Sequence, residues 1–451
     1  MGQQRSTGYD SDPHDLNRTI TLVPLVLFGI AYIAPFIVLI TFGDFSEVAE
    51  GTLPTSYVVS TIAMIFTALS YGKLAKIFPV SGSAYTYARH AIDSRVGFMV
   101  GWAVMLDYFF LPMVVWLIGI GYLTDEYPSV PKIVWLLAFI ILTTALNVIG
   151  ISLATRVNLV LIAWQALVIV LFVVFALIEV LGAGGSGITA APFWHSGSTI
   201  SAVSAGAALT AYSFIGFDAV STFSEEVKDP RRTVPRAIVG TAAAAGLIFI
   251  AVSYVAQLVH PGGHFASPDS APLQIAREIG GAAYGSVFLA TVILAQFTAG
   301  IPIQAAGARL MFAMGRDNAL PRVVFGRLHP RFRTPVLNLL LTAAVGFVAL
   351  FLSVSTSTSF INFGAFTAFA FVNLSVMALY LRERQTEHRN PASWILQPLI
   401  GFAVIVWLYT HLDKDAIILG CIWVVLGFCW LLWITRGLRR PPPVMELDEA
   451  H

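Results

Sequence analysis

The chain has 451 residues, of which 57% are hydrophobic and 11% are charged. This composition is typical of a polytopic membrane protein and excludes a soluble domain built on one core. A formal net charge of +1 does not point to a nucleic acid partner. The only cysteines, Cys421 and Cys429, fall in the last apolar run and indicate neither a disulfide framework nor a metal site.

Residues 1–21 are polar and predict a cytoplasmic tail with no cleaved signal peptide. Runs of about 20 apolar residues, enough to cross ~30 Å of hydrocarbon as a helix, follow this tail. Together they predict twelve membrane-spanning helices in an all-α integral membrane protein. The predicted spans are Leu22 to Phe42, Ser56 to Phe78, Val96 to Tyr122, Ile133 to Ile149, Val157 to Leu181, Ile200 to Phe223, Ala237 to Val259, Ala282 to Phe312, Pro335 to Leu352, Ser359 to Leu381, Trp394 to Thr410 and Ala416 to Thr435.

The basic residues indicate the orientation of these spans. Of the 26 lysines and arginines, 23 lie in loops, tails and adjoining span ends on the side of the N-terminus, and Lys132, Arg277 and Lys414 lie on the other side. Positive charge is retained on the cytoplasmic side of membranes. Both termini are therefore predicted to be cytoplasmic, with residues 436–451 forming a C-terminal tail.

Two spans carry interruptions at membrane depth. In the sixth, Gly216 stands two residues before Asp218, and in the first, Pro35 removes a backbone hydrogen bond from the middle of the helix. Broken helices in transporters leave backbone groups free to hold a substrate or an ion. A flexible glycine and an ordinary proline kink are the plainer alternatives.

The two breaks occupy matching positions in the chain, each in the first helix of a possible five-helix unit. We therefore expect an inverted repeat of 5+5 helices, in which helices 1 and 6 are discontinuous and two extra helices follow. The expected units are residues 22–181 for the first repeat, 199–381 for the second and 394–435 for the extra helices.

Acidic residues are the only charges expected deep in the membrane, namely Asp107 in the third span and Asp218 in the sixth. Such an acid binds an amine, accepts a coupling proton or pairs structurally with a hydroxyl or amide. Tyr108 and Tyr212 are candidates for contact with a substrate, although core packing is the plainer role. No metal spacing, catalytic triad or phosphate-binding loop is present, so neither an enzyme, an ATPase nor a cofactor is expected.

Three motifs resemble the amino acid, polyamine and organocation superfamily. They are SYGKL at Ser70 to Leu74 leading into FPVSGSAYTYAR at Phe78 to Arg89, FIGFD at Phe214 to Asp218 with SEEVKDP at Ser224 to Pro230, and AMGRDNALP at Ala313 to Pro321. The resemblance covers nearly the whole chain and is strongest toward bacterial putrescine importers.

The resemblance implies the sodium-coupled leucine transporter fold, alternating access and residence in a bacterial cytoplasmic membrane. It places the substrate between the backbone of Ile33, Ala34, Pro35 and Phe36 and that of Phe214, Ile215, Gly216 and Phe217. Asp218 takes the position of a proton-sensing acid, and Tyr212 that of a gating aromatic residue. Tyr85 and Tyr87 are expected at a cytoplasmic gate.

Three departures from the family pattern bear on the substrate. Ile33-Ala34-Pro35 replaces a Gly-Ser-Gly sequence whose N–H groups hold a carboxylate, which disfavours a standard amino acid. Gln165 stands where proton-coupled relatives carry a lysine, and Ile40 stands where putrescine importers carry an aspartate.

The leading hypothesis is an importer of a small amine-bearing solute, first putrescine or another polyamine, that uses a coupling proton in a lipid bilayer. An amino acid permease or exchanger is the alternative within transport. A substrate sensor that has lost transport is the alternative from another class.

Overall fold

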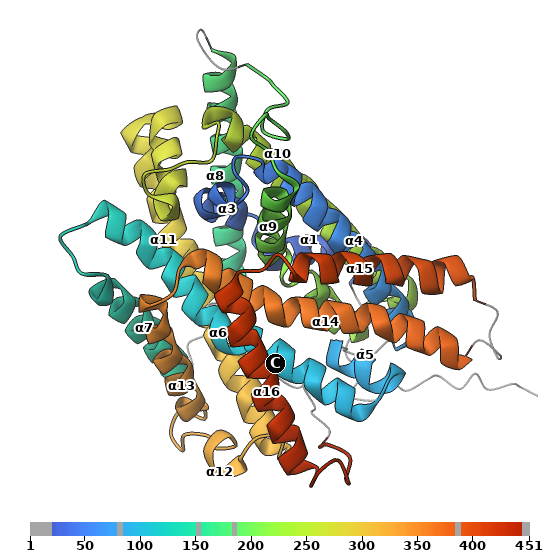
Figure 1. Ribbon diagram of the computed structural model, residues 1–451. Helices are drawn as coiled ribbons and strands as arrows, with labels where there is room; N and C mark the ends of the chain where they lie inside the picture. The colour runs from blue at the N-terminus through green and yellow to red at the C-terminus, as the bar shows by residue number, and fades with distance from the viewer. Residues whose placement is uncertain (1–19, 79–83, 150–154, 183–186, 384–388, 444–451) are drawn as a thin grey trace, which may run out of the picture.

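The computed structural model describes residues 20–78, 84–149, 155–182, 187–383 and 389–443, in which the regular secondary structure is helical apart from one isolated bridge between Ile20 and Val227. The motif residues Pro79 to Ser83, residues 1–19 of the N-terminal tail and residues 444–451 of the C-terminal tail lie outside the described residues. Figure 1 gives the arrangement of the helices.

Before the sixth predicted span the helices are α1 (Leu22–Ile33), α2 (Ile37–Ile40), α3 (Phe42–Val48), α4 (Leu53–Ile77), α5 (Ala84–Ala91), α6 (Ser94–Glu126), α7 (Lys132–Ile149) and α8 (Thr155–Leu181). From the sixth span on, the elements are α9 (Ile200–Thr210), the 3-10 helices η1 (Ala211–Phe214) and η2 (Phe217–Glu225), α10 (Pro230–Val259), η3 (Pro268–Ser270), α11 (Ala271–Arg316), α12 (Arg322–Phe325), α13 (Val336–Gly346), η4 (Phe347–Leu350), α14 (Val354–Glu383), the π-helix η5 (Ala392–Leu396), α15 (Gln397–Tyr409) and α16 (Lys414–Ile434).

Eleven stretches of the described residues are long and apolar enough to cross a membrane, which confirms an all-helical polytopic protein. The ninth predicted span, Pro335 to Leu352, is the exception. There α13 and η4 form a shorter apolar stretch, Val336–Leu350. At 1.5 Å per residue this stretch reaches only about 22 Å, so the count of twelve spans stays a prediction.

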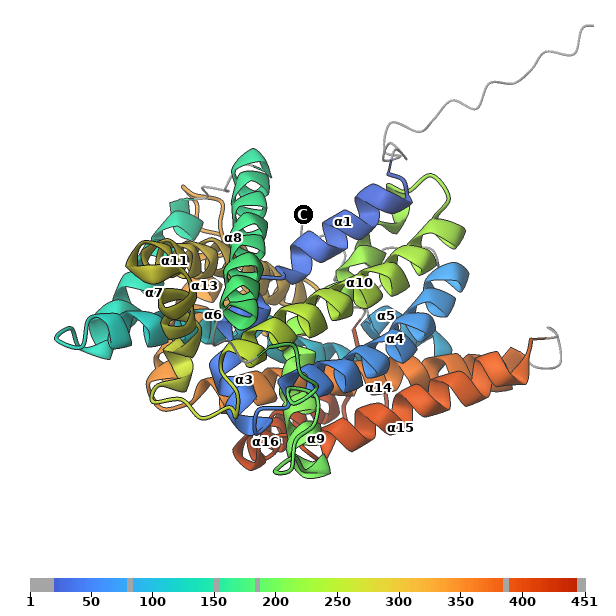
Figure 2. The ribbon, with the colours of Figure 1, turned by 90° about the horizontal axis from the view of Figure 1, so that it is seen from above.

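Two groups of helices make up the molecule. In the first, α10 packs along α4 and also contacts α1 and η2. In the second, α6 packs against α11, and α7 and α13 contact both of these helices. Figure 2 shows the two groups on opposite sides, with α14 and α15 running along the first group. Because α14 contacts α6 as well as α4, it joins the two groups.

The eighth predicted span begins where the backbone bends. Gly281, one residue before the predicted start at Ala282, has φ 71° and ψ −177°, a conformation outside the helical region that suits glycine. The ten residues before it, Ala271 to Gly280, are helical as well, so the segment that precedes the predicted span contains a helix of its own.

Candidate functional site

The first break in the helices lies at Ala34 and Pro35. Helix α1 ends at Ile33, Ala34 adopts the left-handed conformation with φ 52°, and α2 begins at Ile37. The N–H of Ala34 donates to the carbonyl of Ala31, and Pro35 has no N–H. Neither residue therefore offers a free N–H to a substrate carboxylate. Phe36 is buried, with its ring 5.5 Å from that of Phe288 on α11.

The second break lies at Ile215 and Gly216. Here α9 tightens into η1, Ile215 is extended with ψ 128°, and Gly216 has φ 101° before η2 begins. A Cβ on Gly216 would lie 2.4 Å from Cδ1 of Tyr32 on α1. Glycine is required here for two reasons, because the backbone is left-handed and because the two broken helices meet at this point.

Aromatic packing surrounds the second break. Phe214 packs edge-on against Phe249 of α10 at 5.1 Å between ring centroids. Phe217 packs against Tyr71 of α4 at 5.7 Å and against Phe369 of α14 at 5.4 Å. These side chains are buried, so the polar backbone at Ile215 and Gly216 is held in place by apolar neighbours on both sides.

Asp218 lies one residue inside η2. The hydroxyl of Tyr71 donates to its Oδ2 at 3.2 Å, and Ser221 donates to its backbone carbonyl at 2.7 Å. Asp107 of α6 and the tyrosines Tyr32 and Tyr108 are within electrostatic range of Asp218. The structure thus brings together both acids that the sequence singled out.

Asp107 has a different environment. Its Oδ1 atom is buried and accepts no hydrogen bond among the described residues. A Cβ on Gly364 of α14 would lie 3.2 Å from this atom, so the carboxylate faces the backbone of α14. Neither Asp107 nor Asp218 forms an ion pair within the described part of the chain.

Two aromatic side chains near the acids are accessible. Tyr32 is 53% exposed and Tyr108 is 37% exposed, although both lie in apolar helices. Each is close enough to Asp218 to interact with it electrostatically. Two rings within electrostatic range of the acids are therefore partly exposed rather than packed in the core.

The two predicted gate tyrosines of α5 point to different places. The ring of Tyr87 packs edge-on against Tyr71 at 5.9 Å and is thereby linked to Asp218. Tyr85 instead lies in a cluster with Phe98 and Trp102, and Arg89 donates to its hydroxyl at 3.3 Å. Tyr212 is buried in η1, 7% exposed.

Tyr71 and Tyr32 are the neighbours of the acids that the sequence reading did not assign to the site. Tyr71 belongs to the SYGKL motif, but that motif does not indicate which residue its hydroxyl contacts. A buried tyrosine hydroxyl requires a hydrogen-bond partner, and this requirement is the one signal that points to Tyr71 in advance.

At another place in the molecule, a cavity of about 610 Å³ is lined by carboxylates of α3, α6 and η3. These are Asp44, Glu47, Asp125 and Asp269. Burial and the neighbouring Asp269, which also hydrogen-bonds it, raise the pKa of the Asp44 carboxyl well above its usual range.

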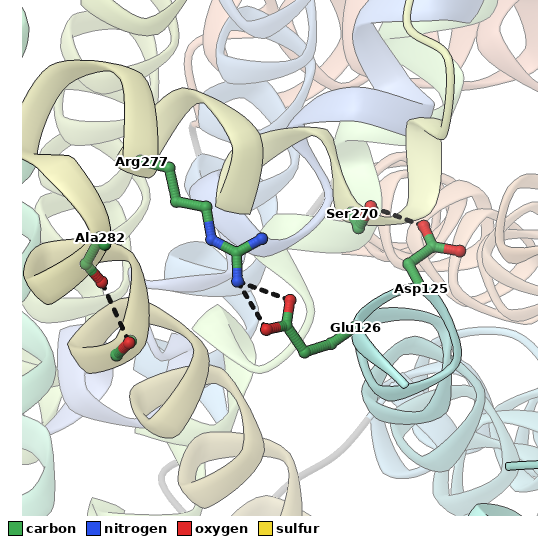
Figure 3. A network of polar contacts seen from close by, with 6 residues as sticks. Asp125, Glu126, Ser270, Arg277 and Ala282 are labelled. Atoms are coloured by element: carbon green, nitrogen blue, oxygen red, sulfur yellow. Dashed lines mark hydrogen bonds and ion pairs between the residues drawn. The ribbon is translucent and has the colours of Figure 1, made fainter. Parts of the chain in front are cut away.

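Beside the cavity, Ser270 donates to Asp125 at 2.6 Å and Arg277 pairs with Glu126 at 2.6 Å (Figure 3). Within the described residues no group of three His, Cys, Asp or Glu side chains is arranged to hold a metal ion.

These features define a class of protein. A helical membrane protein with two broken helices, and with carboxylates in apolar helices that lack ion-pair partners among the described residues, is built like a polytopic transporter. The chain belongs to the amino acid permease family, whose model matches residues 25–438.

Several relatives are similar over nearly their whole length. The chain is 37% identical over 440 residues to the low-affinity putrescine importer PlaP of Escherichia coli, covering 96% of this chain and 97% of that protein. It is 28% identical to the methylthioribose transporter of Bacillus subtilis, covering 92% of this chain and 93% of that protein. The branched-chain amino acid permease BcaP of the same organism is also 28% identical, with 94% and 92% covered.

Among solved structures, the manganese transporter of Eremococcus coleocola has a TM-score of 0.53 at 13% identity, covering 95% of this chain and 99% of that chain. This likeness concerns the fold alone. The sequence-based assignment to the superfamily, with a resemblance to putrescine importers, is confirmed.

Proposed function

We propose that the chain imports a small amine-bearing solute, first putrescine, across a bacterial cytoplasmic membrane by alternating access. The observation that carries this proposal is the pair Asp107 and Asp218, which lack ion-pair partners among the described residues although they lie in apolar helices. A cationic amine supplies the missing positive charge, and a diamine supplies one ammonium for each acid. The similarity to the putrescine importer PlaP supports the choice of putrescine.

Accessible aromatic rings add to this recognition. Tyr32 and Tyr108 are within electrostatic range of Asp218 and are partly exposed. An ammonium close to an aromatic face gains about 0.5–2 kcal/mol. We assign to these two rings, with the backbone of Ile33 to Phe36 and of Phe214 to Phe217, the role of enclosing the methylene chain of the substrate.

The inverted repeat is part of the same proposal. If residues 22–181 and 199–381 are the two repeats, α4 corresponds to α10, α6 to α11 and α7 to α13. The two helices of each of these three pairs contact each other, which supports units related by a two-fold axis. Both termini are proposed to be cytoplasmic, in agreement with the distribution of lysine and arginine.

Proton coupling is assigned to Asp218. This acid hydrogen-bonds Tyr71, whose ring contacts Tyr87 on α5 and Phe369 on α14. A change in the charge on Asp218 would therefore act, through Tyr71, on the packing of α5 and α14. Asp218→Asn is expected to transport with little dependence on pH, and a variant that keeps the full pH dependence of wild-type uptake would remove Asp218 from this role.

The decisive experiment measures uptake of labelled putrescine into proteoliposomes with an alkaline interior, with and without a protonophore. Unlabelled alanine, arginine and glutamate serve as competitors. Uptake that the protonophore abolishes and that only polyamines block is the expected result.

An amino acid permease is the second candidate, supported by the similarity to BcaP. The first break argues against it, because Ala34 uses its N–H within the helix and Pro35 has none to offer. Counterflow that depends on internal amino acid, without response to a pH gradient, would favour this candidate. Tight binding without any flux would instead indicate a sensor.

A further inference from the structure

Seven arginines lie in two loops at the ends of membrane helices. Four are in residues 322–333, between α11 and α13, and three are in residues 436–440, after α16. All seven are exposed, and neither stretch contains an aspartate or a glutamate. Within the described part of the chain none of the seven forms an ion pair. We call this set the arginine surface.

The two loops are neighbours because both pack on one cluster of buried side chains. Phe325 of the first loop and Leu438 of the second contact this cluster, which includes Leu320. In addition, Trp430 of α16 donates its indole N–H to the carbonyl of Ala319 at 2.6 Å, shortly before the first loop. Figure 1 shows α12 and the C-terminal end of α16 at the same end of the molecule. The seven arginines are therefore carried by adjacent segments.

The first loop has a fixed backbone. The N–H of His329 donates to the carbonyl of Thr334 at 2.9 Å, and its own carbonyl accepts from the N–H of Arg333 at 2.9 Å. Its Nδ1 atom accepts from the N–H of Arg331 at 3.3 Å. Thr334 fastens the loop to α7 by donating to the carbonyl of Val148 at 3.0 Å. These bonds hold Arg333 at φ 56°, a conformation that residues with a Cβ rarely adopt.

Exposed apolar side chains lie among the arginines. Val323 is 68% exposed and Leu328 is 42% exposed, both in the first loop. Trp433 in the last turn of α16 is 70% exposed. Tryptophan is enriched where a membrane meets water, so this residue indicates that the arginine surface lies at the depth of the lipid headgroups. Phosphate groups and the upper parts of acyl chains are both present at that depth.

We propose that the arginine surface binds the phosphate groups of anionic phospholipids. A guanidinium group binds phosphate through paired N–H donors, and a cluster of arginines directly beside a membrane helix attracts anionic lipid. The inference goes beyond the proposed function and takes from it only the placement of both loops on one side of the membrane.

The acidic stretch that follows the second loop in the sequence is the competing occupant. Its acids are Glu446, Asp448 and Glu449, which supply three negative charges against the seven positive charges of the arginine surface. Lipid headgroups are not limited in number in this way. Charge complementarity therefore favours lipid over this stretch.

Thermal unfolding of the full-length protein in neutral detergent tests the proposal. Phosphatidylglycerol is expected to raise the unfolding midpoint of the wild type by roughly 3 °C, because a ligand that binds the folded state stabilises it. Phosphatidylcholine, which has no net charge, should not raise the midpoint. The variant that combines Arg327→Gln, Arg331→Gln and Arg333→Gln should lose most of this rise.

The matched control removes three exposed arginines from another helix end. It combines Arg231→Gln, Arg232→Gln and Arg236→Gln at the start of α10, on the same predicted side of the membrane. This control should keep the full response to phosphatidylglycerol. Equal losses in the two triple variants would mean that lipid responds to surface charge in general, and would overturn the assignment to the arginine surface.

Two further arms separate lipid from other anions. Inorganic phosphate at the same concentration should leave the midpoint unchanged, because it offers nothing to the exposed apolar side chains. A rise that phosphate reproduces would assign the surface to a free anion and contradict lipid binding. Deletion of residues 444–451 should leave the response to phosphatidylglycerol as it is. A response that appears only after this deletion would show that the acidic stretch is the occupant.

Native mass spectrometry provides a direct count of bound lipid. Delipidated wild-type protein, offered phosphatidylglycerol and phosphatidylcholine in equal amounts, should retain the anionic lipid in about tenfold excess. The triple variant in residues 322–333 should retain the two lipids about equally, and an unchanged preference would refute the proposal. Neither measurement uses putrescine, so a failure of the proposed transport function would not affect the result.

Discussion

At the scale of single residues, Asp107 works against the stability of the fold. Its buried Oδ1 accepts no hydrogen bond among the described residues, and no cation pairs with it there. An unpaired carboxylate in a low-dielectric region costs several kcal/mol unless it is neutralised or compensated. Such a cost is expected at a binding site, where the ligand supplies the compensation.

Asp107→Asn should therefore separate stability from activity. Removing the charge is expected to raise the thermal unfolding midpoint of the detergent-solubilised protein by roughly 2 °C or more, because an uncompensated charge is lost. Putrescine uptake should fall about 100-fold, since an ion pair with the substrate is lost. Asp415→Asn, an exposed acid on α16, is the control and should change neither property. A less stable Asp107→Asn protein would show that this carboxylate serves the fold.

At the scale of helices, the two breaks depend on one close approach. Gly216 combines φ 101° with a position where a Cβ would meet Tyr32 at 2.4 Å. Gly216→Ala should lower the free energy of unfolding by about 1–3 kcal/mol and abolish uptake. Gly240→Ala in α10, where the nearest atom lies 3.4 Å from the added Cβ, is the matched control. Adding Tyr32→Ala should recover part of the stability, because it removes the clash but not the backbone strain.

The sequence predicted those features that depend on local interactions and missed those that depend on residues far apart in the chain. Pro35 and Gly216 act on their own backbone, so both breaks could be located from local chemistry. The partner of Tyr71 is 147 residues away in the chain, and no local pattern names it. Tyr85 and Tyr87 share a helix, but residues two apart face away from each other, so only one of them reaches Asp218 through Tyr71.

At the scale of the whole molecule, the two helix groups meet near the acidic cavity. Tyr122 of α6 donates to the carbonyl of Ile40 at 2.7 Å, and Phe36 packs against Phe288 of α11. Asp44 of α3 contacts Asp269 of η3 at this same junction. Two neighbouring carboxyl groups can pack together only when at least one is protonated. The packing at this junction is therefore expected to depend on pH.

The sign of this response follows from Asp44. The raised pKa of Asp44 means that this carboxyl binds its proton more tightly when α3 is packed against η3 than when the two are apart. Packing of α3 against η3 is therefore favoured at low pH and weakens as pH rises through that raised pKa. A cysteine at Ser355, which lines the cavity, should be labelled faster by a membrane-impermeant reagent as pH increases, in a background with Cys421 and Cys429 replaced by serine. Asp44→Asn imitates the protonated acid and should keep labelling slow across the pH range. The other carboxylates that face the cavity, Glu47, Asp125 and Asp269, remain in both proteins, so a pH response that survives in Asp44→Asn would assign the effect to them.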